Sequence, residues 1–351
     1  MSKSRIGARI RCSADEVLGE IERFRGLKVA VVGETIIDEY VYCDAIGKSG
    51  KEPMLVCRHI SAESQGGGAL AIANHLAEFS DSVELVSALG ENDSREDFVR
   101  SALMPQVKPH FIYKRGSPTI VKRRYLDAYS LAKLMGVYNY NPENLCSRDE
   151  RAFADLVESA ASRCDVVIAA DYGHGLITSK IVELLVTQAR FLAVNTQMNA
   201  ANQGYHTLSK YPRLDYACVH EGELRLDARD LHGEVLTLAK SALARTQARA
   251  LTVTRGKKGS LFLHRDSGSF ECPALATKVL ERVGAGDAVL ALTSLAVAAG
   301  VAPDVVGLLG NLAGAQQVSV MGNSAHVEKG RLIAHVRELL PSKAGLESVR
   351  A

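Results

Sequence analysis

The strongest constraint on the fold is an alternation of short apolar runs with longer segments of helical spacing. A continuous apolar run suits a strand buried on both faces, and strands that alternate with helices form a mostly parallel sheet covered by helices on both faces. The apolar runs lie at 28–33, 83–90, 165–170, 191–195, 216–219 and 250–254, and the helical segments at 69–79, 94–103, 149–162, 178–190 and 234–248. The sequence therefore predicts the α/β class.

One large domain with short flanking segments is expected. Residues 1–26 form a basic tail followed by a helix that opens at Ser13, with Glu16 as its capping-box partner. Residues 27–340 form the domain, and 341–351 a C-terminal tail. The last third of the domain is helical, at about 287–299, 302–320 and 325–339.

One part of the sequence breaks the alternation. Residues 39–66 and 110–140 contain β-branched and aromatic runs with polar alternation and turn residues, and no helix lies within either stretch. Such runs suit a small antiparallel sheet that hangs on the edge of the main domain and faces solvent. A lid over a ligand site is the functional interpretation. A structural extension or a contact between two copies in a homodimer is the alternative.

Charge and cysteine usage narrow the classes of partner. A formal net charge of +2 over 351 residues gives no reason to expect nucleic acid or an anionic membrane as the main partner. No apolar run is long enough to span a bilayer, and the first residues lack the apolar core of a signal peptide. The seven cysteines are scattered without a CxxC pair, which is typical of reduced thiols in a cytoplasmic protein.

A glycine-rich turn at 283–287 (VGAGD) precedes an almost wholly apolar helix. The first N–H groups of a helix lack internal partners, and glycines let an anion approach them closely. Gly284, Ala285 and Gly286 would thus form an anion hole for a phosphate, and Asp287 could act as a base toward a hydroxyl that attacks it. An aspartate that merely caps a buried helix is the alternative, and the physical argument alone leaves both open.

Five motifs, in order within residues 28–335, resemble the ribokinase/PfkB family of carbohydrate kinases. They are VVGETIIDEY, QGGGALAIANHLA, VTRGKKGSLF, GAGDA and GNLAGAQQV. The resemblance implies a ribokinase-like fold, a sugar or sugar phosphate as substrate, and ATP and Mg²⁺ as cofactors. It also implies that Asp287 is the base and that the residue 284–287 turn holds the transferred phosphoryl group.

The resemblance implies further site residues in each motif. Those expected to hold the sugar are Asp38, Gly67, Gly68 and Asn74, the last standing in for an asparagine that is Ala71 here. Those expected to lie against ATP are Thr254, Gly256, Gly259 and Asn311. Glu223 would also border the nucleotide and order Mg²⁺ through water.

Two more motifs resemble the heptose-7-phosphate kinases within that family. ADYGHGLIT matches a strand end at Asp171 and Tyr172, with His174 in place of lysine. In SPTIVKRRYLD, Lys122 and Arg124 lie two residues apart, so both would point from one face of a lid strand toward an anionic group on the sugar. A solvated basic strand edge is the alternative. The expected substrate is a heptose 7-phosphate or a related glycan-precursor sugar.

Several positions depart from the family's pattern. Glu281 and Val283 replace residues of a monovalent-cation site, so dependence on such an ion is left open. His220 replaces an asparagine before Glu223. Residues 195–197 (NTQ) replace Asp-Pro-Lys and begin a polar run at the carboxyl end of a predicted parallel strand. This place favours a re-specified sugar pocket that includes Asn195, and an ordinary polar loop is the alternative.

These departures motivate a second hypothesis, a sugar- or nucleotide-binding protein that has lost catalysis. The intact GAGD turn and Glu223 argue against it, because a pure binder needs no proton acceptor there. A dinucleotide-dependent oxidoreductase is excluded, since VVGETIID lacks the GxGxxG that such a fold needs after its first strand. The heptose-7-phosphate kinases that the sequence resembles form one half of a bifunctional protein. The other half, an adenylyltransferase, is not expected after residue 340.

Overall fold

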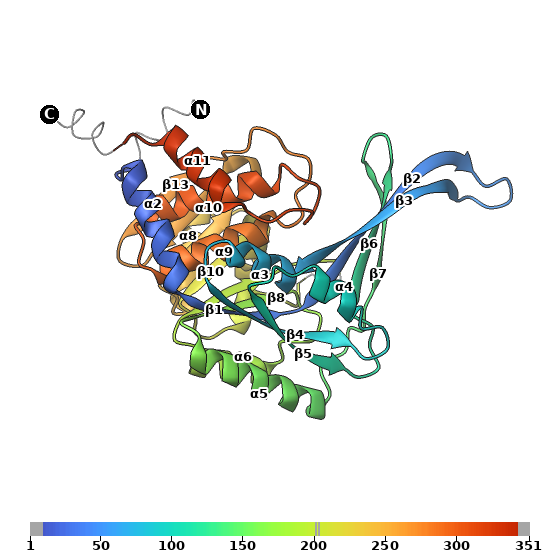
Figure 1. Ribbon diagram of the computed structural model, residues 1–351, viewed down its shortest axis with the longest axis horizontal. Coiled ribbons are helices and arrows are strands. Elements are labelled where there is room, and N and C mark those ends of the chain that lie inside the picture. Colours follow the sequence, from blue (N-terminus) through green and yellow to red (C-terminus); the bar gives the residue numbers. More distant parts are fainter. Residues whose placement is uncertain (1–9, 201, 203, 343–351) are drawn as a thin grey trace.

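The computed structural model describes residues 10–200, 202 and 204–342 of the chain (Figure 1). The tail predicted at the start of 1–26 and most of the tail at 341–351 lie outside the described residues. The helix predicted after the first tail is present as α2 (Ala14–Arg23). Its capping box is confirmed, because the Ser13 N–H donates to Glu16 Oε2 at 2.7 Å and the Glu16 N–H donates to Ser13 Oγ at 3.3 Å.

A nine-stranded sheet forms the centre of the molecule, in the order β13-β12-β11-β10-β9-β8-β1-β4-β5. From β11 to β5 all neighbouring strands pair in parallel, and β12 and β13 add two antiparallel pairings at one edge. The strands are β1 (Lys28–Gly33), β4 (Ser82–Gly90), β5 (Val107–Lys114), β8 (Val166–Asp171), β9 (Leu192–Thr196), β10 (Tyr216–His220), β11 (Ala250–Thr254), β12 (Ser260–His264) and β13 (Gly268–Cys272). The predicted parallel sheet is confirmed.

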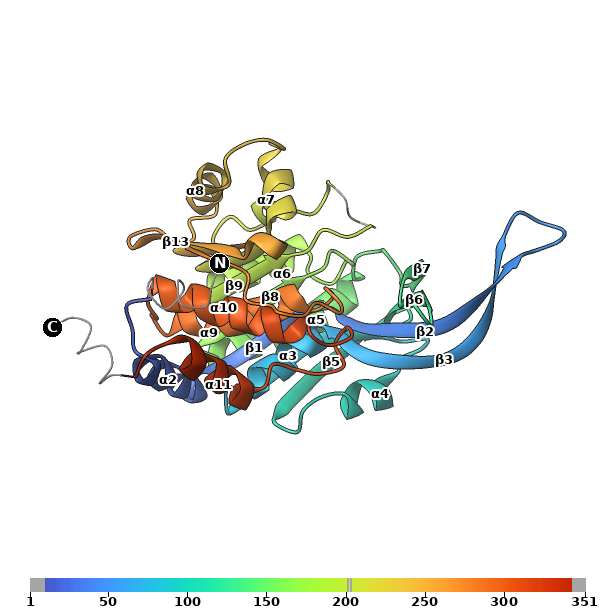
Figure 2. The same ribbon diagram turned by 90° about the horizontal axis from the view of Figure 1, so that it is seen from above.

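Helices cover both faces of this sheet, as Figure 2 shows. One face carries α2, α3 (Ala69–Ala77), α9 (Ala285–Ala298), α10 (Pro303–Gln317) and α11 (Lys329–Leu339). The other carries α5 (Ser147–Arg163), α6 (Ser179–Gln188), α7 (Glu221–Ala228) and α8 (Val235–Arg245). Successive residues of β1 alternate between the two cores: Val29 and Val31 pack in one, Ala30 and Val32 in the other.

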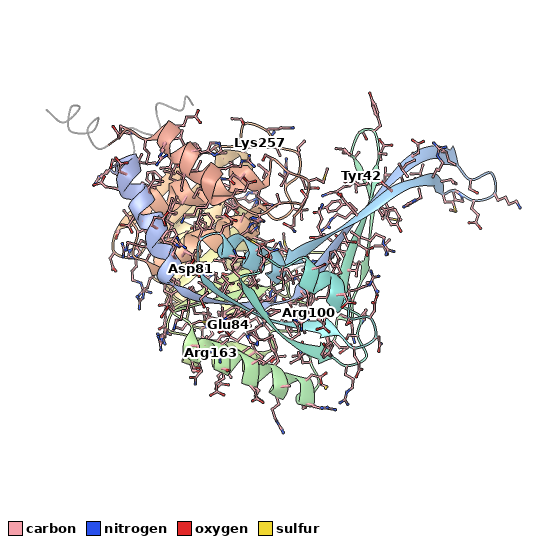
Figure 3. The ribbon with its side chains drawn as sticks, viewed as in Figure 1. Tyr42, Asp81, Glu84, Arg100, Arg163 and Lys257 are labelled. Atoms are coloured by element: carbon pink, nitrogen blue, oxygen red, sulfur yellow. The ribbon has the colours of Figure 1, made fainter. Side chains whose placement is uncertain are left out.

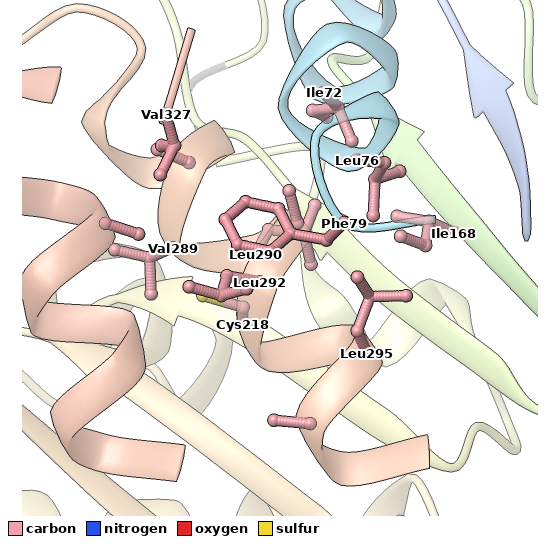
Figure 4. Close-up of a cluster of buried hydrophobic side chains, with 14 of the residues drawn as sticks. Ile72, Leu76, Phe79, Ile168, Cys218, Val289, Leu290, Leu292, Leu295 and Val327 are labelled. Atoms are coloured by element: carbon pink, nitrogen blue, oxygen red, sulfur yellow. The ribbon is translucent and has the colours of Figure 1, made fainter. Parts of the chain in front are cut away.

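Helix α9 lies at the heart of one core. Every residue from Asp287 to Ala296 is buried. Figure 4 shows Leu290 and Leu295 of this helix among the side chains of α3, with Phe79 beside them. A helix that is apolar all round is fixed on every side, so its first turn is held in a constant position.

A second sheet projects from one side of the central sheet (Figures 1 and 2), in the order β3-β2-β6-β7. We call it the lid sheet. Its strands are β2 (Thr35–Lys48), β3 (Leu55–Gly68), β6 (Ile120–Asp127) and β7 (Lys133–Asn139). The predicted antiparallel pairing holds for β2–β3 and β6–β7, but the central pair β2–β6 is parallel. The reason is that β2 continues from β1 and β6 follows β5, and β1 and β5 run in the same direction.

The predicted second lid stretch, 110–140, begins too early. Residues 110–114 belong to β5, which pairs in parallel with β4 in the central sheet. This strand lies at the edge, so it is only half-buried, and its alternation resembles that of an antiparallel strand. The short helix α4 (Glu96–Ser101) connects β4 to β5.

Charged side chains of both signs are interspersed on the outside of the molecule. Among those labelled in Figure 3, Arg163 pairs with Glu84 at 2.7 Å, and Asp81 lies 3.3 Å from Arg25. None of the helices within 10–342 that the structure describes is long and apolar enough to cross a membrane. None of the seven cysteines, all of which lie within the described residues, forms a disulfide.

Candidate active site

The predicted anion hole lies at the open N-terminus of α9. Gly284 caps the helix in a left-handed conformation (φ 80°), and a Cβ added to it would lie 2.1 Å from Oδ1 of Asn323. This position therefore requires glycine. A Cβ added to Gly286 would meet no heavy atom within 4 Å, so this residue faces open space. The turn thus presents backbone N–H groups to a space that an anion could enter.

Asp287 stands in the first turn of α9 and is only 7% exposed. Its Oδ1 accepts a hydrogen bond of 2.8 Å from the hydroxyl of Tyr172, which follows β8. Burial raises the pKa of the Asp287 carboxyl to about 7, and the hydrogen bond from Tyr172 opposes that rise. A carboxyl with a pKa near 7 can accept a proton at neutral pH, which is what a general base must do.

Asp38 of β2 lies beside this turn and is held from two sides. Its Oδ1 accepts a 2.5 Å hydrogen bond from Nη1 of Arg124, and its Oδ2 accepts one of 3.2 Å from Nδ2 of Asn323. A Cβ added to Gly67 would lie 2.3 Å from Oδ2 of Asp38. Asp38, Gly67 and Gly284 therefore converge on one place, as the sequence predicted, with Asn323 between them.

Lys122 of β6 points to the same place from the lid sheet. The register of β2 and β6 pairs it with Asp38, and its side chain lies on the same face as Arg124. It is 6% exposed, and its ammonium lies 5.8 Å from the ring centres of Tyr138 and Tyr172. Within the described part of the chain this ammonium has no hydrogen-bond partner, and burial lowers its pKa.

The predicted sugar residues Asp171 and Asn195 have other partners in this structure. The buried Asp171 carboxylate accepts hydrogen bonds from Nζ of Lys210 at 2.7 Å and from the hydroxyl of Tyr211 at 2.8 Å. Nδ2 of Asn195 donates to the carbonyl of Cys218 at 2.7 Å. Asp171 thus braces the loop between β9 and β10, and Asn195 joins β9 to β10; their predicted contacts with a sugar stay predictions.

The polar run after β9 supports the strand end that carries Tyr172. Nδ2 of Asn199 and Nδ2 of Asn202 donate to the Tyr172 carbonyl at 2.7 and 2.9 Å. Residues 201 and 203 of this run lie outside the described part of the chain. Asn199 and Asn202, two of the amides predicted to re-specify a pocket, thus hold in place the backbone of Tyr172, whose hydroxyl donates to Asp287.

Asn74 and Gly68 have structural roles near the residue 67–68 turn that was predicted to contact the sugar. Asn74 donates to the Ala102 carbonyl at 2.8 Å and accepts from the Met104 N–H at 2.9 Å, so it ties α3 to the segment after α4. Both polar atoms of the Asn74 amide thus have a backbone partner, and its predicted contact with the sugar stays a prediction. Gly68 caps α3 with φ +60°, and a Cβ there would lie 2.6 Å from the carbonyl oxygen of Glu34.

The residues expected to lie against ATP surround the carboxyl ends of β10 and β11. Thr254 ends β11, and Gly256 starts a one-turn 3-10 helix, η3 (Gly256–Lys258), with open space around it. Gly259 has φ +86°, and a Cβ there would lie 2.0 Å from the carbonyl oxygen of Cys272. Nδ2 of Asn311 donates to Oγ of Ser260 at 2.6 Å, which joins α10 to the start of β12.

Glu223 is the only side chain that the sequence offered for magnesium. It accepts N–H hydrogen bonds from His220 at 2.7 Å and Met198 at 3.0 Å, and burial raises its pKa. Its charge also raises the pKa of Asp287, so the two carboxyls face the same region. The described residues contain no cluster of three metal-ligating side chains. Such a site fits an ion held mainly by phosphates and water, the usual mode for Mg²⁺.

Glu281 joins the lid sheet to the segment before the anion hole. Its Oε2 lies 2.8 Å from Nζ of Lys133 in β7, and its Oε1 accepts the Arg282 N–H at 2.7 Å. Together with Asn323, this contact was missed by the sequence analysis. Glu281 was considered only as a departure from a cation site, and Asn323 belongs to none of the motifs, although Gly322 before it is a turn signal.

Comparison with known proteins gives one family and one fold. The sequence model of the pfkB family carbohydrate kinases matches residues 27–329. Bifunctional protein HldE of Koribacter versatilis is 29% identical over 311 residues, covering 87% of this chain and 62% of that protein. The protein of the same name in Pseudomonas aeruginosa is 28% identical over 312 residues, covering 86% and 62%. The chain thus spans less than two thirds of the length of these relatives.

Two solved structures have the same fold. Phosphofructokinase-2 from Escherichia coli in complex with potassium superposes with a TM-score of 0.71 at 15% identity, covering 88% of this chain and 99% of that one. Arabidopsis thaliana ribokinase complexed with ribose and ATP superposes with a TM-score of 0.66 at 15% identity, covering 89% and 99%. The ribokinase-like fold predicted from the sequence is confirmed.

Proposed function

Because this chain belongs to the PfkB family of carbohydrate kinases, we propose that it transfers the γ-phosphoryl group of ATP to a hydroxyl of a sugar phosphate. A heptose 7-phosphate is the first candidate, since the chain is similar to HldE proteins over most of its length. The observation that carries the proposal is the buried Asp287 carboxyl, with a pKa of about 7, beside an open helix N-terminus.

Asp287 is the proposed general base. At neutral pH part of its population is ionised and can take the proton of the acceptor hydroxyl. The hydrogen bond from Tyr172 occupies Oδ1 and leaves Oδ2 for that proton. Burial keeps the carboxyl away from bulk water, so the proton acceptor is kept for the bound hydroxyl.

The first turn of α9 is the proposed anion hole. The backbone N–H groups of residues 284–287 stand at the positive end of the helix dipole, and Gly286 leaves room for a close approach. Because α9 is buried all round, these groups are aimed before any ligand binds. Preorganised donors of this kind commonly contribute about 3–4 kcal/mol each to the transition state.

The lid sheet and the residue 67–68 turn are proposed to orient the sugar. Asp38 offers carboxylate oxygens to sugar hydroxyls, and its position is fixed by Arg124 and Asn323. Lys122 supplies a buried ammonium for an anionic group on the sugar. ATP, when bound, would supply the phosphoryl group near Thr254 and Gly256, and Mg²⁺ on its phosphates, ordered by Glu223, would offset their charge.

A homodimer through the lid sheet is part of the proposal. Several apolar side chains of this sheet are exposed, Ile46, Leu55, Ile60, Met135 and Val137, and so is Met54 directly before β3. Clustered apolar residues on a projecting sheet are typical of a protein interface. The cytoplasmic location expected from the sequence stays a prediction.

The test is consumption of ATP, measured with a panel of pentose, hexose and heptose phosphates and the matching unphosphorylated sugars. We expect turnover with at least one sugar phosphate, Mg²⁺ being present. The alternative hypothesis, a binding protein without catalysis, predicts sugar or nucleotide binding in a thermal-shift assay and no ATP consumption with any member of the panel.

A further inference from the structure

A small cavity lies at the root of the lid sheet, next to the site described above, and a few polar side chains stand in its lining. Its volume is about 30 Å³, and its lining includes Glu34, Lys114, Ser117, Ile120 and His174. A space of this size holds about one water molecule or one hydroxyl-bearing carbon. The proposed reaction makes no use of His174 or Ser117.

Two polar side chains of this lining have no partner for their polar atoms. His174 is 3% exposed, and neither of its ring nitrogens has a hydrogen-bond partner within the described residues. Ser117 is 1% exposed, and its Oγ likewise has none in the described part of the chain. Buried polar atoms are nearly always hydrogen-bonded, so two such side chains on one cavity indicate that something polar occupies it.

The two charged groups of the lining, Lys114 and Glu34, already have hydrogen-bond partners. Nζ of Lys114 donates to the carbonyls of Asn141 at 2.9 Å and Glu143 at 2.5 Å. The Glu34 carboxylate accepts N–H hydrogen bonds of 3.0 Å from Tyr172 and from His174. The unpartnered atoms therefore identify the groups left for a ligand, which are the imidazole and the serine hydroxyl.

The chemistry of these groups favours a neutral hydroxyl over an anion. Burial, together with the charges of Lys122 and Lys114, lowers the pKa of His174 to about 3, so the ring is neutral and has one donor and one acceptor. The Ser117 hydroxyl also donates and accepts. A sugar hydroxyl does the same, whereas a phosphate only accepts and would face the carboxyl of Glu34.

The cavity adjoins the proposed sugar site. Ile120 lies two residues before Lys122 on β6, so the two side chains share a face of the lid sheet. His174 follows Tyr172, the donor to Asp287, by two residues. A sugar held between Lys122 and Asp287 could thus extend a hydroxylated carbon toward His174.

We propose that His174 and Ser117 form a subsite for a neutral hydroxyl group of the acceptor sugar, away from the hydroxyl that is phosphorylated. This inference rests on the proposed sugar kinase activity and adds a specificity determinant to it. His174 and Ser117 are thus assigned to substrate choice, whereas Lys122 is assigned to the anionic group of the same sugar.

The test compares His174→Phe, His174→Gln and Ser117→Ala with the unchanged protein, using the sugar of the panel that the unchanged protein phosphorylates fastest. Loss of one or two neutral hydrogen bonds predicts a KM for the sugar that is about 5–20-fold higher in H174F, and about 3–10-fold higher in S117A. The KM for ATP and the kcat are expected to stay within about twofold. H174Q, which keeps a donor and an acceptor, is expected to recover most of the sugar affinity.

His75→Phe is the matched control. His75 is also fully buried, its pKa is also lowered to about 3 by burial, and its Nε2 has no partner among the described residues. It lies in α3, where its Nδ1 accepts a hydrogen bond of 3.0 Å from the Val327 N–H, and it does not line the cavity. Melting temperatures of all variants report whether each folds, and S117A keeps the test informative if a histidine variant does not.

Sugar KM values in H174F and S117A that equal that of the unchanged protein would overturn the subsite and leave the kinase activity intact. A sugar KM that rises equally in H75F would also overturn it, because the effect would then be one of core stability. Failure of the unchanged protein to phosphorylate or bind any sugar of the panel would instead refute the proposed function, and the subsite with it.

Discussion

The hydroxyl of Tyr172 donates a 2.8 Å hydrogen bond to Oδ1 of Asp287, although the two residues are 115 positions apart in the sequence. The donor stands at the carboxyl end of β8, and the acceptor stands in the first turn of α9. Burial raises the pKa of Tyr172 well above its usual value, so this hydroxyl stays protonated and remains a donor. The central sheet and α9 together therefore set the basicity of one carboxyl.

Replacement of Asp287 by Asn is expected to lower kcat by about 10²–10⁴-fold, the usual contribution of a general base. Binding of an inert ATP analogue should remain measurable by calorimetry, because the amide keeps the shape of the turn. A variant with more than a tenth of the original kcat would show that another group takes the proton.

The same variant should be more stable than the unchanged protein at high pH. The pKa of Asp287 is about 7 in the folded state and near 3.8 when the carboxyl is unperturbed, so the folded protein holds the proton more tightly. The contribution of Asp287 to the free energy of unfolding is fully present below pH 3.8 and is lost as the pH rises through 7. Asn cannot ionise, so the difference in melting temperature between D287N and the unchanged protein should grow from pH 5 to pH 8. A difference that is constant with pH would contradict the raised pKa.

The pH profile of kcat/KM tests the Tyr172 contact. Activity should rise with pH up to an inflection near 7, as Asp287 loses its proton. In Tyr172→Phe the hydrogen bond that opposes the rise in pKa is absent, so the inflection should move to higher pH. An inflection near pH 4 in the unchanged protein, or one that is the same in Y172F, would refute this account of the base.

Gly286→Ala separates folding from phosphate binding. An added Cβ at Gly286 meets no atom of the protein within 4 Å, so the variant should fold with a melting temperature close to the original. The methyl group would stand where an anion must approach the backbone, and kcat should fall by about 10-fold or more, as expected when an oxyanion contact is lost. Gly330→Ala in α11 also meets no atom and is the control, with activity expected to be unchanged.

Lys122→Met tests the proposed contact between the Lys122 ammonium and an anionic group on the sugar. Loss of a charge-assisted hydrogen bond costs about 1.5–3 kcal/mol, so the KM for a sugar phosphate should rise by about 10–100-fold. The KM for the unphosphorylated sugar should change little. Arg123→Met is the control, because Arg123 lies on the opposite face of β6 and pairs with Glu39. Equal effects of both variants would indicate that the lid sheet contributes only general positive charge.

Val137→Glu tests the proposed lid dimer. Val137 is 45% exposed and pairs with Arg123, so it lies on the face of the lid sheet that is turned away from Lys122. A charge there should convert a dimer to a monomer in sedimentation measurements, because burying a charged side chain in an apolar interface is costly. A protein that is monomeric before the substitution would exclude the dimer directly.

Local patterns were enough to predict the central sheet and the glycine-rich turn before α9. The runs at 28–33 and 165–170 are buried on both faces, and such strands have a clear sequence signature. Glycines before an apolar helix predicted an open helix N-terminus, but only the family resemblance assigned Asp287 there as a base rather than a helix cap. The convergence of Asp38, Gly67 and Gly284 followed only from the family resemblance, since their separations in sequence carry no distance information.

The sequence was less informative about contacts between distant segments. Asp171 and Asn74 look like ligand-binding polar residues, but Lys210 and the backbone near Ala102 use their polar atoms. Asn323 was missed because a single amide in a short loop carries no periodicity and no spacing signal. The parallel pairing of β2 with β6 could not be predicted from alternation, because alternation fixes which face is buried and not the direction of the neighbouring strand.

One residue, Glu34, separates the end of β1 from the start of β2. Its carboxylate holds the N–H groups of Tyr172 and His174, while its carbonyl holds the N–H of Ala69. Glu34 therefore connects three parts of the molecule: the start of the lid sheet, the start of α3 and the strand end that carries Tyr172. If the lid sheet tilted at Glu34, the backbone of Tyr172 would move with it. Access of water to the proposed site and the hydrogen bond from Tyr172 to Asp287 would then change together.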